Sequence, residues 1–109
     1  MEVIPHIFGG DILFVIITYD VSVTSKGGEK RLRDVAKYCE NIGQRVQNSV
    51  FECLLDYAKY KKVKSDLTDI IDVKLDSIRF YNLGNKWNSK VVHVGTVESL
   101  NMESGTLIL

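Results

Sequence analysis

The clearest feature of the hydropathy pattern is an unbroken apolar run that leads into a carboxylate. Residues 14–20 read Phe-Val-Ile-Ile-Thr-Tyr-Asp, which is typical of a strand covered on both faces and therefore of a central strand. Asp20 ends the run, and loop residues follow from Ser22 to Gly28. An acid at the mouth of a central strand is rigidly held and open to solvent, which suits a metal ion or a phosphate-bearing partner. The alternative is that Asp20 only caps a turn.

Two later segments have the spacing of amphipathic helices. The first carries an apolar stripe made of Leu32, Val35, Ala36, Cys39 and Ile42, and Gly43 is a favourable stop for it. The second is predicted to begin after Asp56 as its N-cap. Its apolar stripe is made of Tyr60, Val63, Leu67, Ile70 and Ile71. The lysines in its first half could serve an external anion or be a chance arrangement.

The remaining patterned segments predict strands. Residues 44–55 alternate between polar and apolar, which indicates either two short strands or one long bent strand. Ser77–Leu83 is predicted to be a fourth strand and Lys90–Thr96 a short fifth one, with Trp87 in the loop between them. The apolar end Gly105–Leu109 needs burial, and an exposed strand of this kind is a template for pairing with another chain.

This element order predicts an α+β fold of the ferredoxin-like βαββαβ type with an appended C-terminal strand. Both helices would cover one face of the sheet, and the bare face would pack on a partner, most simply a second copy. Residues 13–109 would form this domain. Residues 1–12, broken by Pro5 and Gly9-Gly10, would be an extension that is poorly ordered or an added leader.

Composition narrows the class of protein without identifying a function. A chain of 109 residues is one domain by size, and its formal net charge is zero, so composition gives no evidence for nucleic-acid binding. Cys39 and Cys53 have no metal-ligand spacing and are interpreted as reduced core thiols. The sequence contains neither a transmembrane run nor a signal peptide, which predicts an intracellular, cytoplasmic protein without a membrane partner.

Four blocks of sequence together carry a specific resemblance. They are residues 14–21, 28–33, 43–52 and 77–84, read in order along one short chain. In these blocks the chain resembles the Cas2 family, the small CRISPR-associated protein of the spacer-acquisition module of antiviral defence. The resemblance runs from about residue 13 to the end, and the tail from Gly95 to Leu109 resembles that of subtype I-C members. Residues 1–12 depart from the family pattern.

The resemblance implies a ferredoxin-like homodimer that bridges dimers of the Cas1 integrase and helps to hold the DNA to be inserted. Many family members are described as metal-dependent endonucleases acting on RNA or double-stranded DNA, and the acid that matches theirs is Asp20. Mg²⁺, or Mn²⁺ in its place, takes oxygen ligands. One acid per chain is a poor site, so the expected site combines two Asp20 side chains across a two-fold axis. Ser22 could add a ligand oxygen or bind phosphate.

Other site residues are expected on the same basis. Arg31 and Arg33 open the first helix, where an anion is favoured, and the resemblance favours contact with the nucleic-acid backbone over a purely solvated role. Arg45 and Arg79 could reach phosphate or pair with acids instead. Phe51 is a core or dimer-interface aromatic. The tail residues Leu107 and Ile108 are expected at an interface with the second copy or the integrase.

Three functions therefore compete on the sequence alone. The first is an adaptation scaffold with a metal site, and the second is a free-standing, metal-dependent ribonuclease of toxin type. The third is a non-catalytic module that binds nucleic acid or a small molecule. No glycine-rich phosphate loop and no metal-spaced Cys/His cluster supports a small-molecule site.

Overall fold

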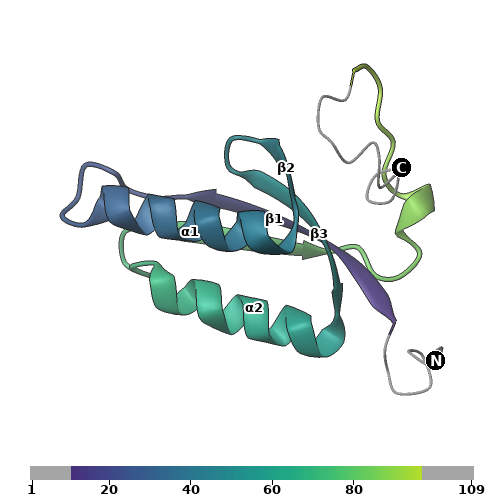
Figure 1. Ribbon diagram of the computed structural model, residues 1–109, viewed down its shortest axis with the longest axis horizontal. Helices are drawn as coiled ribbons and strands as arrows, with labels where there is room; N and C mark the ends of the chain where they lie inside the picture. Colours follow the sequence, from purple (N-terminus) through teal and green to yellow (C-terminus); the bar gives the residue numbers. More distant parts are fainter. Residues whose placement is uncertain (1–10, 97–109) are drawn as a thin grey trace.

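The computed structural model describes residues 11–96 and has the predicted βαββαβ order (Figure 1). The elements are β1 (Ile12–Asp20), α1 (Gly28–Ile42), β2 (Gln44–Gln47), β3 (Val50–Asp56), α2 (Tyr57–Ile70), β4 (Ser77–Asn82) and the 3₁₀ helix η2 (Trp87–Ser89). The four strands form one antiparallel sheet in the order β2-β3-β1-β4. This is the ferredoxin-like arrangement, so the predicted fold class is confirmed. Residues 44–55 form two strands, the first of the two alternatives.

Strand β1 is central, as its apolar run predicts, because it pairs with both β3 and β4. Successive side chains point to opposite faces of a strand, and those of Val15, Ile17 and Tyr19 lie in the hydrophobic core with Phe51 and Cys53 of β3. The other set, which includes Asp20, therefore lies on the opposite face of the sheet. Strand β1 thus contributes side chains to the hydrophobic core from one face and Asp20 to the candidate site from the other.

Both helices cover the same face of the sheet (Figure 1). Val35 and Cys39 of α1 and Val63 and Leu67 of α2 are completely buried in the core. Helix α2 begins as predicted, with the Asp56 carboxylate accepting a 2.7 Å hydrogen bond from the backbone N–H of Lys59. Both cysteines are free and buried, in agreement with the sequence.

Gly43 ends α1 for a reason that the sequence pattern does not reveal. Its backbone is extended and donates to the Cys39 carbonyl oxygen at 3.0 Å. A Cβ atom at this position would lie 2.5 Å from Cys53 Sγ and 2.6 Å from the Glu52 carbonyl oxygen. The glycine is therefore required because β3 passes too close for a side chain.

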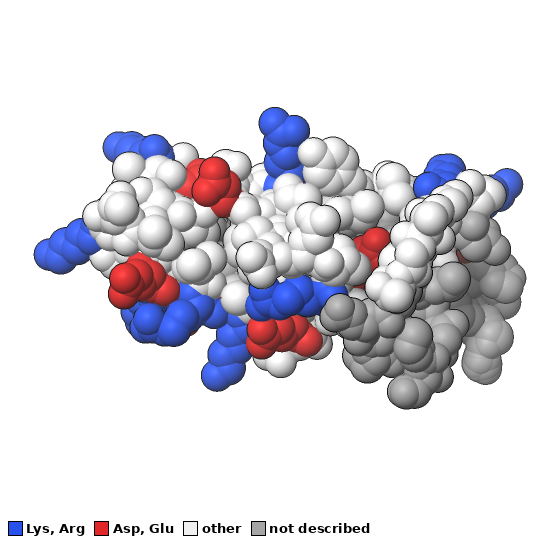
Figure 2. Space-filling model, turned by 90° about the horizontal axis from the view of Figure 1, so that it is seen from above, with Lys and Arg blue, Asp and Glu red and all other residues white. Residues whose placement is uncertain are grey.

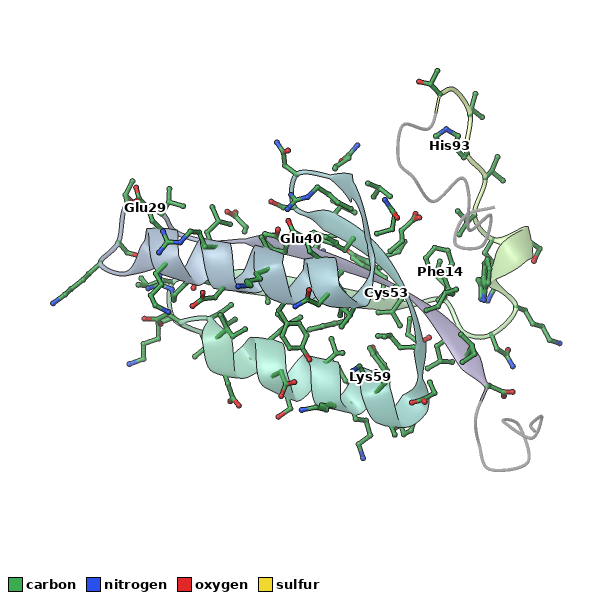
Figure 3. The ribbon with its side chains drawn as sticks, viewed as in Figure 1. Phe14, Glu29, Glu40, Cys53, Lys59 and His93 are labelled. Carbon is green, nitrogen blue, oxygen red and sulfur yellow. The ribbon has the colours of Figure 1, made fainter. Side chains whose placement is uncertain are left out.

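The face opposite the helices is partly covered by the chain itself. Phe14 lies on this face and is completely buried, because the Trp87 ring of η2 packs against it with centroids 5.2 Å apart and planes at 90°. Backbone hydrogen bonds from Leu83 to the Phe14 carbonyl and from Phe14 to the Gly84 carbonyl extend the β1–β4 pairing up to this point. In Figure 3, Phe14 lies at the end of the sheet beside η2.

The predicted fifth strand, Lys90–Thr96, is wrong. Lys90 completes a turn with Trp87, and residues 91–96 have no strand structure. Val92 and Val94 are 83% and 88% exposed. Their β-branched pattern suggested a strand, but a strand needs a neighbour, and no edge of the described sheet pairs with this segment. Trp87 itself lies in η2 and not in an irregular loop.

Some predictions fall on parts of the chain that lie outside the described residues. These are the extension over residues 1–10, most of the subtype-like tail, the apolar end Gly105–Leu109, and the interface residues Leu107 and Ile108. Within the described part of the chain, neither helix has the length and apolar character needed to cross a membrane.

Candidate functional site

Asp20 is the last residue of β1 and is exposed on the sheet face that the helices do not cover. Its register partner is Ser77, the first residue of β4. No lysine or arginine within residues 11–96 forms an ion pair with it. The carboxylate is therefore held by a central strand and is open to an external ligand.

The described residues form no cluster of metal ligands around Asp20. Among the described residues, no group of three or more His, Cys, Asp and Glu side chains is placed to hold a metal ion. A hard cation such as Mg²⁺ prefers several oxygen ligands and can keep waters for the remainder. Asp20 carries the right type of ligand atom for such a cation.

The loop that follows Asp20 is fixed through its backbone. The Ser22 N–H donates to Asp76 Oδ1 at 2.9 Å, and the Ser22 carbonyl oxygen accepts from Ser25 Oγ at 2.6 Å. Gly28, the first residue of α1, lies so close that a Cβ there would be 2.0 Å from the Ser22 carbonyl oxygen. Ser22 thus lies beside Asp20 in a constrained turn.

Arg31 points inward to Asp76. Its Nε donates to Asp76 Oδ2 at 2.7 Å and its Nη2 to Asp76 Oδ1 at 3.2 Å, and the arginine side chain is only 16% exposed. The hydrogen bonds from Arg31, followed by those from the backbone of Asp72 and Ser22, lower the pKa of Asp76 to about 2 despite its burial. The guanidinium is therefore committed to an internal acid.

Arg33 is exposed on the outer side of the same helix turn. It borders a shallow hollow of about 340 Å³ at the start of α1, together with Lys30 and Glu29; Figure 3 labels Glu29 at this end of the molecule. Lys30 pairs with Asp34 at 2.7 Å, whereas no acid within the described chain pairs with Arg33. Arg33 is thus available to an external anion.

Arg45 is paired with an acid, whereas Arg79 is paired with none among the described residues. Arg45 pairs with Glu40 at 2.8 Å, also donates to the Asn48 carbonyl oxygen, and its guanidinium lies 4.8 Å from the centre of the Phe51 ring. Arg79 donates to the Tyr81 hydroxyl at 3.2 Å and is on β4 opposite Thr18. Its side chain therefore projects from the same face of the sheet as that of Asp20.

Phe51 is enclosed within the protomer. It is 0% exposed and stacks on Tyr19 with ring centroids 6.2 Å apart. The Tyr19 hydroxyl donates to the Asn48 carbonyl oxygen at 3.4 Å, as expected for a core tyrosine. Of the two roles considered for Phe51, the geometry is that of a core aromatic, facing the helices.

Two acids have surroundings that the sequence pattern does not indicate. Asp76 precedes β4 and is the only buried charged residue in the described core; its signal was a lone acid directly before a strand. Glu52 lies on β3 opposite Ile16, with its Oε1 buried and without a hydrogen-bond partner. Burial raises the pKa of Glu52, and the nearby charge of His93 partly offsets this.

The described part of the face seen in Figure 2 carries no broad patch of one charge. Figure 2 shows lysine and arginine side chains interspersed with acids over the described part of the face seen there, without one continuous basic patch. This agrees with the balanced composition of the chain.

Comparison with known proteins identifies a family for this site. Residues 13–91 match the family described as CRISPR associated protein Cas2. The chain is 53% identical over 91 residues to the CRISPR-associated endonuclease Cas2 of Halalkalibacterium halodurans, covering 84% of this chain and 95% of that protein. It is 50% identical over 97 residues to the CRISPR-associated endoribonuclease Cas2 of Chlorobaculum tepidum, covering 89% of this chain and 100% of that protein.

A solved structure gives the same result. The crystal structure of Streptococcus pyogenes Cas2 at pH 6.5 is 54% identical in sequence and superimposes with a TM-score of 0.64. The superposition covers 75% of this chain and 99% of that chain. The resemblance found in the sequence is therefore confirmed at the level of the family.

Proposed function

Because this chain belongs to the Cas2 family of CRISPR-associated proteins, we propose that it serves spacer acquisition and is a metal-dependent endonuclease with Asp20 as its metal-binding acid. The observation that carries the proposal is the position of Asp20, exposed at the end of the central strand and without an ion-pair partner among residues 11–96. The names of two relatives, an endonuclease and an endoribonuclease, support the reaction class.

In this proposal two protomers form a homodimer in which their Asp20 carboxylates face a common Mg²⁺ or Mn²⁺. Two like charges brought together repel, and a cation between them relieves the repulsion. The bound cation would supply charge neutralisation at the scissile phosphate and a more acidic water as the nucleophile. A second protomer would supply the second acid, since no group of three or more His, Cys, Asp and Glu side chains among the described residues is placed to hold a metal ion.

The basic residues would orient the polymer. Arg79 projects from the Asp20 face, and Arg33 is exposed at the start of α1. Contacts of this kind reach phosphate and carry no sequence information, which suits a protein that must accept arbitrary sequences. His93 Nε2 lies 2.9 Å from the Gly95 carbonyl oxygen, which can only accept, so this nitrogen donates within its own segment.

The test compares wild-type protein with Asp20→Asn, which preserves shape and removes charge. We expect Mg²⁺-dependent cleavage of RNA or duplex DNA to be lost while the far-UV spectrum stays unchanged. Asp69→Asn, an exposed acid on α2, is the matched control and should cleave normally. Cleavage that survives Asp20→Asn would contradict the metal-site assignment.

The scaffold role is tested separately. We propose that the dimer bridges Cas1 integrase dimers and holds the incoming DNA. This role is favoured as a second candidate function because no group of three or more His, Cys, Asp and Glu side chains among the described residues is placed to hold a metal ion. Spacer acquisition that persists in Asp20→Asn would leave the scaffold role standing alone. Cleavage of RNA by the free protein, with no effect of the integrase, would favour the toxin-type ribonuclease instead.

The C-terminal end is proposed as part of the interface, through Leu107 and Ile108. We expect deletion of residues 106–109 to weaken dimerisation or the association with the integrase. Sedimentation velocity and pull-down with the integrase measure the two effects. Unchanged behaviour in both would contradict this part of the proposal.

A further inference from the structure

We infer that Arg31 and Asp76 form an internal ion pair whose role is to fix the Val21–Gly28 loop behind Asp20, so that both are positioning residues and Arg31 is not a phosphate contact. The inference rests on the proposed function only for its effect on cleavage. The structural part of the inference depends only on the contacts that Arg31 and Asp76 make.

Asp76 has no capacity left for a cation. Its Oδ1 accepts from the Ser22 N–H at 2.9 Å and from Arg31 Nη2 at 3.2 Å. Its Oδ2 accepts from Arg31 Nε at 2.7 Å and from the Asp72 N–H at 2.9 Å. A carboxylate offers about four acceptor positions, and all four are used by a side chain that is completely buried. Asp76 therefore cannot act as the second acid of a metal site at Asp20.

Arg31 is similarly engaged. Besides its two bonds to Asp76, its Nη2 donates to Ser25 Oγ at 2.8 Å and its Nη1 to the Lys26 carbonyl oxygen at 2.9 Å. An arginine recognises a phosphate through a pair of parallel N–H groups, and here that fork is directed at Asp76. The neighbouring Arg33 has no such internal partner in the described chain. The two arginines are two residues apart and serve different purposes.

The pair acts on the backbone beside Asp20 from two directions. Asp76 binds the N–H of Ser22, two residues after Asp20, and directly precedes Ser77, the register partner of Asp20. Ser25, held by Arg31, binds the Ser22 carbonyl oxygen at 2.6 Å. The chain on both sides of the Asp20–Ser77 pairing is therefore tied to one carboxylate, and a site group is effective only when its supporting contacts hold its position.

The first experiment needs no catalysis. Binding of duplex DNA is measured over a series of salt concentrations for wild type, Arg31→Ala and Arg33→Ala. The plot of log K against the logarithm of the salt concentration has a negative slope, and each lost phosphate contact makes this slope shallower by about 0.9. We expect this reduction for Arg33→Ala and an unchanged slope for Arg31→Ala. An equal reduction in both would overturn the inference, because Arg31 would then be a phosphate contact.

The second experiment examines the loop directly. In Asp76→Asn we expect the backbone amides of Ser22 and Asp72 to exchange hydrogen faster by about tenfold or more, while amides in the middle of β1 keep their protection. Arg31→Ala, which leaves Asp76 without its ion-pair partner, should affect the same amides and serves if Asp76→Asn does not fold. Unchanged exchange of Ser22 in a folded variant would overturn the inference.

The third experiment connects the pair to the reaction. Asp76→Asn should lower kcat by about tenfold or more with KM nearly unchanged, since a misplaced acid loses rate and not substrate contacts. A raised KM at constant kcat would overturn the positioning role. If wild type itself shows no cleavage, the proposed function fails, and the binding and exchange experiments still decide the role of the pair.

Discussion

The indole ring of Trp87 packs edge-on against Phe14, with ring centroids 5.2 Å apart, on the sheet face opposite the helices. The contact keeps a phenylalanine completely buried on a face that would otherwise leave it open to water. Trp87→Ala should therefore lower the free energy of unfolding by roughly 2 kcal/mol, less than for a fully enclosed tryptophan.

Urea denaturation followed by far-UV circular dichroism measures this effect, because Trp87 is the single tryptophan of the chain and its fluorescence is lost in the variant. Lys86→Ala, at an exposed neighbouring position, is the control and should leave stability nearly unchanged. If the two variants are equally stable, η2 does not contribute to the protomer as described.

The Arg31–Asp76 pair predicts a specific acid sensitivity. The pKa of Asp76 is lowered from 3.8 to about 2, first by its hydrogen bonds with Arg31. Because the folded-state pKa lies below the unfolded value, the carboxylate stabilises the fold fully above the unfolded value. That stabilisation is lost as the pH falls from 3.8 to about 2. The Asp76 carboxylate therefore contributes roughly 1–2 kcal/mol to the free energy of unfolding, a value reduced because solvent reaches the partly exposed Arg31 side chain.

The measurement is the urea midpoint of wild type and Asp76→Asn as a function of pH. The variant should be less stable at neutral pH, and the gap should close through the acid range. Asp69→Asn is the exposed control and should follow the wild-type curve. A gap that stays constant down to the lowest pH would show that the charge of Asp76 is not what matters.

The charge of the Glu52 carboxyl should have the opposite effect on stability to that of Asp76. Burial raises the pKa of this carboxyl, and its Oε1 has no hydrogen-bond partner in the described chain. A raised folded-state pKa means that the charged form opposes folding above the usual value and that this penalty disappears at low pH. Glu52→Gln should therefore stabilise the protein by about 1 kcal/mol at neutral pH.

Thermal unfolding at neutral and acidic pH tests the prediction, with the exposed Glu29→Gln as control. The gain from Glu52→Gln should shrink as the pH falls. A loss of stability at neutral pH would mean that the Glu52 carboxylate has a partner that the protomer alone does not provide.

Most of the fold could be predicted because hydropathy and local signals agree in it. The continuous run before Asp20 marked the central strand, and Asp56 marked the start of α2. The predicted strand at residues 90–96 failed for a physical reason. β-Branched residues, as in Val92-His93-Val94, favour an extended conformation. A strand also needs a neighbouring sheet edge to pair with, and the sequence does not reveal whether one is within reach.

The candidate site was only partly visible in the sequence. The exposed position of Asp20 at the end of the central strand could be predicted, because the residue directly follows the apolar run. The different roles of Arg31 and Arg33 could not be found, because both open the same helix and only the fold brings Asp76, 45 residues away, against one of them. The burial of the Asp76 carboxylate and of the Glu52 Oε1 atom carries no local signal, since the environment of each is made by distant segments.

The sharing of one cation by the Asp20 carboxylates of two protomers is the central claim, and calorimetric titration with Mn²⁺ tests it most directly. We expect one ion bound per two chains and no binding at that site in Asp20→Asn. Binding of one ion per chain, or binding that Asp20→Asn leaves intact, would contradict it.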